Sequence, residues 1–482
     1  MTQLDAVVVG AGPNGLAAAV TLARAGLRVH VLERDAVPGG GARTMELTLP
    51  GFWHDVCSAV HPLAVASGFF RAFGLERRVG FAVPDASFGQ PLDGGRAAVA
   101  YRSLQRTADE LGRDGRAYAR LVGPLARRAD AVAGFTGAPL LPLPRHPFAF
   151  ARFSLAALGQ SGPWWNAGFR EDAAPALITG AMAHAILRLP GLGTAGAGLS
   201  LAAYAHARGW PIPLGGSQAI ADALIADLVA HGGSLETGVE VGSLDELPSA
   251  RVVLLDVAPR ALLRLAGERV PRGYRRALER FRHGNGVAKV DFALSAPVPW
   301  TDERLRLAGT VHVGGTRADV ARAENEVARG RHPESPYVLV SQPSLFDPSR
   351  APAGRHTLWA YTHVPAGSRL DRTEAVVRQI ERFAPGFRDT ILASASMDAA
   401  AVEAHNPNYV GGDISAGEPS FAQLVRRPVL SADPWRTPIP GVYLASASCA
   451  PGPGVHGMVG WRAALSALRH EFGVRDAPAL AP

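Results

Sequence analysis

The residues whose types and spacing most clearly support chemistry are three glycines near the start of the chain and one carboxylate. Gly10, Gly12 and Gly15 form a G-x-G-x-x-G pattern, and Glu33 follows eighteen residues after the last glycine. Glycines at these positions permit a tight turn, a close approach of backbone to a pyrophosphate, and close packing of a helix on a strand. A carboxylate at this distance can accept hydrogen bonds from the ribose hydroxyls of an adenosine. The pattern predicts a dinucleotide-binding site.

A second glycine cluster comes soon after Glu33. Residues 39–43 contain three glycines, Ala42 and Arg43, which suits a loop that runs along a pyrophosphate and a ribityl chain. Residues 33–44 resemble the second FAD signature of the flavin amine oxidase and phytoene desaturase superfamily. The whole chain is similar to a bacterial branch of that superfamily, of the pyridine nucleotide-disulphide oxidoreductase domain-containing protein two type. The resemblance implies an FAD held by Gly10, Gly12, Pro13, Asn14, Gly15, Glu33, Arg34, Gly40, Gly41, Ala42 and Arg43.

The C-terminal region resembles the last FAD motif of the same superfamily. Residues 440–448 predict a strand, and the glycine-rich run 451–460 leads to a helix whose N-terminus can stabilise the anion of a reduced flavin. The turn 446–448 lacks the carboxylate that is customary there, and Cys449 stands in a context unlike that of a flavin-linked cysteine, so we expect non-covalent FAD. The resemblance implies contacts from Ser446, Ser448, Gly454, Val455 and His456, and an adenine contact from the backbone of Val239.

Three residues are candidates for catalysis. Lys289 is the only lysine of the chain, and a lysine offers a compact, titratable charge that arginine cannot replace. In flavin amine oxidases a similar strand carries a lysine that holds a water against flavin N5, and the resemblance implies this role here. The alternative is an exposed strand lysine that pairs with Asp291. We expect His456 beside the flavin ring as a base or an orienting donor, and His61 as a polar contact.

Substrate contacts are expected from two segments. Residues 404–413 concentrate hydrogen-bonding side chains on a loop, although a scaffold of Asx turns explains them equally well. His54 lies in a second segment that is expected near the flavin. His54 and His61 have no third ligand at a suitable spacing, so no metal site is expected. The candidate substrate residues are His54, His405, Asn406, Asn408 and Tyr409.

The elements that must position these residues alternate between strands and helices. The apolar run 6–9 predicts a buried strand, residues 16–25 a helix, and residues 27–32 a second strand that ends at Glu33. Residues 101–210 are mostly helical in pattern, and residues 286–294 predict a strand. We therefore expect an α/β, two-domain fold in which a glutathione-reductase-type Rossmann FAD domain is interleaved with a substrate domain. The FAD domain is predicted at 1–100, 214–270 and 431–482, and the substrate domain at 101–213 and 271–430.

Composition narrows the class of protein. A chain of 482 residues can form about two domains, and it has no uncharged apolar run of eighteen residues that would span a membrane. Because the first predicted strand begins close to the first residue, we expect no signal peptide. Cys57 and Cys449 do not form a C-x-x-C motif, so we expect no redox-active disulfide and a cytoplasmic location.

Charge and local apolar runs bear on the partners. The net charge of +7 comes from scattered arginines without aromatic interleaving, so no nucleic-acid partner is expected. Residues 139–150 are apolar, broken by prolines and flanked by arginines. We favour a packed surface loop here over the alternative, a peripheral membrane contact or an entrance for a lipophilic substrate.

These patterns favour an FAD-dependent oxidoreductase that takes a hydride from a C–C bond of a largely apolar small molecule. No second G-x-G-x-x-G accompanies the predicted nucleotide-fold segment 214–270, so we expect electrons to come from the organic substrate and to leave to oxygen or a quinone. The first alternative is a flavin amine oxidase that acts on a C–N bond. An alternative of another class is a non-catalytic FAD-binding or partner-binding protein, or a redox-neutral flavin isomerase.

Overall fold

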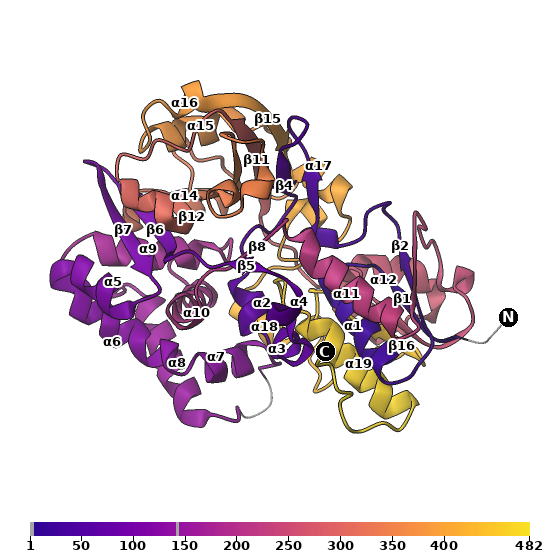
Figure 1. Cartoon of the computed structure of the whole chain (residues 1–482). Helices are drawn as coiled ribbons and strands as arrows, with labels where there is room; N and C mark the ends of the chain where they lie inside the picture. The colour runs from indigo at the N-terminus through magenta and orange to yellow at the C-terminus, as the bar shows by residue number, and fades with distance from the viewer. Residues whose placement is uncertain (1–3, 141–143) are drawn as a thin grey trace.

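A five-stranded parallel sheet is the frame of the N-terminal glycine motif (Figure 1). In the computed structural model, which describes residues 4–140 and 144–482, its strand order is β16-β10-β1-β2-β9. The strands at its centre are continuous apolar runs, as expected where helices cover both faces of a parallel sheet. The strands are Leu4–Val9 (β1), Val29–Glu33 (β2), Ser234–Thr237 (β9), Ala250–Leu255 (β10) and Val442–Leu444 (β16).

Helix α1 (Pro13–Arg24) follows β1 directly and packs against two other helices, α11 (Gln218–Ala230) and α19 (Met458–Glu471). A proline at the first helical position suits a helix start, because its missing N–H has no intrahelical partner there. Gly15 is required for close packing, since a Cβ at this position would lie 2.0 Å from the Gly10 carbonyl oxygen. The remaining helices of this part are Pro62–Ala66 (α2), Gly68–Phe73 (α3), Leu75–Arg78 (α4), Pro259–Ala266 (α12) and Arg272–Glu279 (α13).

A seven-stranded mixed sheet forms the centre of the second part of the molecule. Its order is β15-β11-β14-β13-β12-β6-β7, and only the pairing of β12 with β6 is parallel within the described residues. The apolar side chains of its two faces belong to separate cores, one shared with a helical layer and one with α15 and α16. The strands are Ala86–Leu92 (β6), Arg96–Tyr101 (β7), Gly286–Leu294 (β11), Ala308–Val313 (β12), Val338–Ser341 (β13), His356–Val364 (β14) and Ile391–Met397 (β15).

The helical layer lies below this sheet in Figure 1 and is centred on α10, which packs against α6, α7, α8 and α9. Its helices are Leu104–Glu110 (α5), Gly115–Ala126 (α6), Ala129–Thr136 (α7), Pro147–Gln160 (α8), Ala173–Ala183 (α9) and Leu192–Arg208 (α10). The other helices are Arg317–Val327 (α14), Thr373–Glu381 (α15), Phe387–Thr390 (α16), Ala399–His405 (α17) and Phe421–Val425 (α18).

The chain crosses repeatedly between the two parts. Two short sheets lie near the crossings, one of Thr44–Glu46 (β3) with Trp53–Asp55 (β4), the other of Phe81–Ala82 (β5) with Ile212–Pro213 (β8). The predicted fold class, an α/β fold with a Rossmann-type domain and a second domain, is confirmed.

Two details differ from the sequence prediction or lie beyond it. Strands β6 and β7, which the sequence placed in the first domain, pair in the seven-stranded sheet. Within the apolar segment 139–150, residues 141–143 lie outside the described residues. In the described ranges no helix is both long and apolar enough to cross a membrane.

Candidate active site

A cavity of about 830 Å³ extends from the carboxyl ends of the parallel sheet to the helical layer. Ligands in open α/β sheets bind at this edge, outside the carboxyl ends of the strands. At the nucleotide end, ten of the residues predicted to bind the cofactor line the cavity: Gly10, Gly12, Pro13, Asn14, Glu33, Arg34, Gly40, Gly41, Arg43 and Val239. Two others do not line it: Gly15, which packs closely against the Gly10 backbone, and Ala42, which is fully buried.

The nucleotide end fits a dinucleotide. Gly40 lies so close to the first glycine loop that a Cβ on it would be 3.0 Å from the Cα of Gly12, so the two loops form a continuous backbone surface. The Asn14 side-chain oxygen is buried without a hydrogen-bond partner and belongs to the cavity wall. The Glu33 carboxylate at the end of β2 accepts hydrogen bonds from the N–H groups of Ala11 at 2.7 Å and Asp35 at 3.0 Å.

Asp256 is a site residue that the sequence reasoning missed. It follows β10, and its carboxyl group accepts a hydrogen bond from the Gly15 N–H at 2.9 Å. Burial, with a contribution from Glu33, raises the pKa of Asp256 to about 7, although the hydrogen bond from Gly15 opposes this shift. The signal that could have found it is an acidic residue at the end of an otherwise apolar parallel strand.

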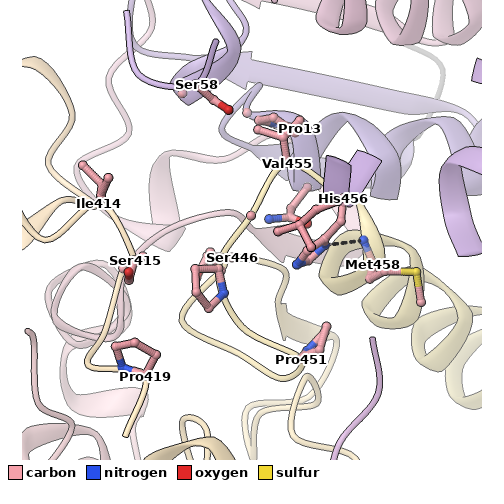
Figure 2. A pocket seen from close by; sticks show the side chains of 18 of the residues that line it. Pro13, Ser58, Ile414, Ser415, Pro419, Ser446, Pro451, Val455, His456 and Met458 are labelled. Carbon is pink, nitrogen blue, oxygen red and sulfur yellow. Dashed lines mark hydrogen bonds between the residues drawn. The ribbon is translucent and has the colours of Figure 1, made fainter. Parts of the chain in front are cut away.

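The C-terminal motif reaches the same cavity. Ser446, Gly454, Val455 and His456 line it, and Figure 2 shows Ser446, Val455 and His456 grouped near the start of α19. Ser448 does not line the cavity; it is fully buried and its hydroxyl donates to the Ala416 carbonyl at 2.7 Å.

Both ring nitrogens of His456 are used by the backbone. Nδ1 accepts from the Met458 N–H at 3.1 Å, the bond drawn in Figure 2, and Nε2 lies 3.1 Å from the Gly452 carbonyl oxygen. Burial lowers the pKa of His456 to about 4. The ring is therefore neutral and fixed in one tautomer, which suits an orienting role better than that of a free base.

His61 lines the cavity from the turn before α2. Its Nε2 lies 2.7 Å from the hydroxyl oxygen of Ser217. Burial lowers the pKa of His61 to about 4. At neutral pH it is an uncharged polar group on the wall.

Lys289 does not line the main cavity. Its ammonium group pairs with Asp291 on the same strand, and both side chains are buried. Burial raises the pKa of Asp291 to about 6, and the charge of Lys289 opposes this shift. A small cavity of about 20 Å³ borders Lys289, and Cys57, Tyr361 and Tyr409 line both this cavity and the main one. Such a volume is about that of one water.

His54 lies behind the same strand and does not line the main cavity. Its Nε2 is 2.8 Å from the Thr48 hydroxyl, and its Nδ1 is 3.5 Å from Asp291. Burial lowers the pKa of His54 to about 3, and the charges of Lys289 and Arg350 act in the same direction. It is part of a buried polar cluster that was hidden from sequence reasoning, because its partners come from distant strands.

The loop after α17 contributes part of the predicted substrate contacts. Asn406, Asn408 and Tyr409 line the cavity, whereas His405 does not. His405 instead contacts the glycine-rich loop 39–43, since its Nε2 is 3.0 Å from the Arg43 guanidinium. Asn408 also accepts from the Ala258 N–H at 2.7 Å, so it joins this loop to the segment that follows Asp256.

The rest of the cavity lies among the helices α7, α8, α10 and α18. Its acidic lining residues, Glu33, Asp35, Glu240 and Asp256, all belong to the strand ends and loops of the parallel sheet. In the described part of the chain, no group of three or more His, Cys, Asp or Glu side chains is placed to hold a metal ion. Apolar lining comes from Ala133, Phe135, Leu140, Phe150, Phe153, Ala157, Leu158, Ile186, Leu192, Ala197, Leu201, Phe421, Leu424 and Val425.

Comparison with known proteins agrees with this geometry. Residues 8–73 match the family described as NAD(P)-binding Rossmann-like domain. Pyridine nucleotide-disulfide oxidoreductase domain-containing protein 2 of Rattus norvegicus is 26% identical, over 97% of this chain and 94% of its own length. The chain is a homologue of this protein.

Two further likenesses concern a segment and the fold. A segment of 45 residues, 9% of this chain, is 56% identical to a segment that makes up 8% of all-trans-zeta-carotene desaturase of Myxococcus xanthus. A putrescine oxidase variant shares the fold with a TM-score of 0.61 at 18% identity, covering 96% of this chain and 98% of its own. The chain thus shares a fold that combines a Rossmann-type domain with a second domain. The predicted resemblance to the desaturase and flavin amine oxidase group is confirmed.

Proposed function

We propose that the protein is an FAD-dependent oxidoreductase that removes a hydride from a C–C bond of a largely apolar, neutral small molecule. The observation that carries this proposal is the composition of one continuous cavity. Its nucleotide end has the glycine loops and Glu33, and its other end is lined mainly by aliphatic and aromatic side chains. Non-covalent FAD fits the C-terminal motif, because its cysteine, Cys449, is fully buried and does not line the cavity.

A bound flavin would supply the hydride acceptor at N5, and oxygen or a quinone would then take up the electrons. The protein's own residues bind the cofactor, orient the substrate and exclude water. Glu33 is placed to accept the ribose hydroxyls, and the N-terminus of α1 offers N–H groups to the pyrophosphate. The apolar helices hold the substrate in a fixed orientation, which contributes to the rate without a charged group.

Lys289 acts from one layer behind the cavity in this proposal. Its charge is held by Asp291, and four residues that line the small cavity beside it also line the main cavity, namely Cys57, Tyr361, Tyr409 and Ile414. A water in that small cavity would connect the ammonium group to the reacting centre. A cation at this distance would stabilise negative charge that develops during reduction and reoxidation.

A flavin amine oxidase is the second candidate, and one observation favours it. Aromatic rings line the main cavity, and Trp359 and Tyr361 are in edge-to-face contact with centroids 5.1 Å apart. Such rings can receive an amine, but the acidic lining residues that would attract its protonated form lie at the nucleotide end.

The absorption spectrum of the purified protein, followed by anaerobic addition of polyenes and of amines, tests these alternatives. Bleaching of the flavin by a polyene and by no amine supports the desaturase proposal, and the reverse result supports an amine oxidase. A flavin that none of these compounds reduces, with a stably co-purifying protein, would favour the binding-protein alternative. A colourless protein that takes up no FAD contradicts the proposal altogether.

A lipophilic substrate could reach the cavity from a membrane surface, and α8 favours this route. Leu158 lines the cavity and is also exposed, so the cavity wall meets the outer face of this helix. That face also exposes Phe148 and Leu155, with the exposed arginines Arg145 and Arg152 beside them. Apolar side chains flanked by arginine suit a peripheral contact with an anionic bilayer.

A further inference from the structure

A pair of histidines lies in the wall of the cavity, far along the sequence from the predicted site residues. His184 follows α9, lines the cavity and is half-buried, while His312 on β12 is fully buried behind it. Their Nε2 atoms are 2.9 Å apart. Trp210 is in edge contact with both rings, and Phe88 packs against His312.

Both rings are neutral. Burial lowers the pKa of His184 to about 3 and that of His312 well below its ordinary value. The other titratable groups of this region are also engaged: His363 pairs with Glu324 at 2.8 Å, and neither lines the cavity. One histidine of the pair therefore donates its Nε2–H and the other accepts.

The second ring nitrogen of His184 is free to meet a ligand. Within the described residues its Nδ1 makes no protein hydrogen bond, and it is not among the side-chain atoms sealed from solvent. Nearby hydroxyls of the helical wall are already bonded: Tyr204 to Thr136 at 2.9 Å, and Ser200 to the Gly196 carbonyl at 2.8 Å. Nδ1 of His184 is thus a polar atom of fixed position on a largely apolar wall.

We propose that His184 is a specificity-determining residue that hydrogen-bonds the neutral hydroxyl or carbonyl oxygen of an otherwise apolar ligand, and that His312 positions it. This inference rests on the proposed function only in placing the substrate in this part of the cavity. A hydroxyl can bond to His184 in either tautomer, whereas a carbonyl requires a proton on Nδ1. A pure hydrocarbon leaves Nδ1 without a partner once water is displaced, which costs affinity.

The test uses three probes of one carbon skeleton: β-ionol, β-ionone and the corresponding hydrocarbon. Their dissociation constants are measured by quenching of tryptophan fluorescence in the purified protein, with the flavin absorbance recorded in parallel. Of the two oxygenated probes, the one that binds more tightly should have a dissociation constant about 10-fold lower than that of the hydrocarbon. His184→Phe should remove this difference, and His184→Gln should restore part of it because the amide can hydrogen-bond.

His206→Phe is the matched control. His206 is also a half-buried histidine of the helical layer, it bonds to the Tyr118 hydroxyl at 2.8 Å, and it does not line the cavity. This variant should keep the preference for the oxygenated probe. Equal affinity for all three probes, binding of none of them, or a preference that survives in His184→Phe would overturn the proposal. Tryptophan quenching needs no flavin, so a colourless protein would contradict the proposed function while the ranking of the probes still tests His184.

Discussion

At the scale of single residues, Asp256 places a carboxyl group beside the glycine turn, where the phosphates of the proposed cofactor would approach. Its side chain accepts from the Gly15 N–H, and a Cβ on Gly12 would lie 2.9 Å from its Oδ2. Glu33 is the other acidic group whose charge acts on it, and the Asn408 amide bonds to its backbone carbonyl at 3.1 Å. An ionised Asp256 would repel a pyrophosphate, so dinucleotide binding favours its protonated form.

The first prediction follows from the raised pKa of Asp256. Because the pKa of Asp256 is raised to about 7 in the fold, the ionised form is disfavoured there, and stability is lost as the pH rises from about 4 through about 7. Asp256→Asn should therefore raise the free energy of unfolding at pH 8 by on the order of 1–4 kcal/mol, and should change little below pH 4. Denaturant unfolding across this pH range measures it.

FAD affinity gives an independent check of the same residue. We expect the dissociation constant of the wild-type protein for FAD, measured by flavin fluorescence, to rise as the pH increases through about 7. Asp256→Asn should flatten this dependence because its amide cannot ionise. An unchanged pH profile in the variant would assign the dependence to another group.

The second prediction concerns Lys289. Replacement by Met removes the buried cation, and we expect reoxidation of the reduced flavin by oxygen to slow by about 10-fold or more. The substitution also leaves Asp291 without its partner, which costs stability. Stopped-flow absorbance measures the reoxidation rate.

The double variant Lys289→Met/Asp291→Asn controls for the broken ion pair. It should regain much of the lost stability, because no unpaired carboxylate remains, and its reoxidation should stay slow. Reoxidation at the wild-type rate in either variant contradicts a role for Lys289 beyond the ion pair with Asp291.

At the scale of elements, the glycine turn and α1 depend on contacts that no other residue permits. A Cβ on Gly15 would meet the Gly10 backbone at 2.0 Å, and one on Gly460 of α19 would meet the Asn14 backbone at 1.7 Å. Backbone cannot move aside as a flexible side chain does. The three elements β1, α1 and α19 are therefore fixed relative to one another by glycines.

The third prediction is that Gly15→Ala destabilises the protein by more than about 2 kcal/mol and abolishes FAD retention. Gly134→Ala in α7 is the control, because a Cβ there meets no atom within 4 Å and alanine favours a helix. Thermal unfolding and the flavin absorbance after gel filtration measure both effects. A Gly15→Ala protein that keeps its flavin and melting temperature would contradict the packing argument.

The sequence predicted the elements around the glycine motif well, because local patterns determine them. The strand predicted at 286–294 coincides with β11, and the helix predicted at 16–25 overlaps α1. The pairing of the strands was harder to predict, since apolar alternation indicates a strand but does not determine which strand it pairs with. β6 pairs with β12, more than two hundred residues later, and this moved residues 86–101 into the second sheet.

In the candidate site, too, local patterns were predictable from the sequence and long-range contacts were not. The glycines and Glu33 were predictable because their spacing along the chain is itself the signal. His184, Asp256 and the pairing of Lys289 inside a buried cluster depend on segments that meet only in the folded chain. For this reason the sequence placed His54 and His405 at the substrate, whereas neither lines the main cavity.

At the scale of the whole molecule, the position of the cavity relative to the surface bears on how a substrate enters. The helix α8 lies at the edge of the molecule in Figure 1, and one of its faces lines the cavity while the other faces outward. The exposed fractions of Phe148 and Leu155 are 84% and 70%, unusually high for large apolar side chains. Trp164, just beyond the helix, is exposed to 70%.

The fourth prediction is that this apolar face binds anionic lipid bilayers. The purified protein should sediment with vesicles that contain phosphatidylglycerol and less with vesicles of phosphatidylcholine alone, because Arg145 and Arg152 flank the face. The triple variant Phe148→Ser/Leu155→Ser/Trp164→Ser should lower vesicle affinity at least about 10-fold, since each side chain loses apolar area that the bilayer would bury. A variant of an exposed apolar residue elsewhere, Leu392→Ser on β15, is the control and should bind as the wild type does. Equal sedimentation of the triple variant and the wild type would contradict a bilayer contact through the exposed side chains of α8.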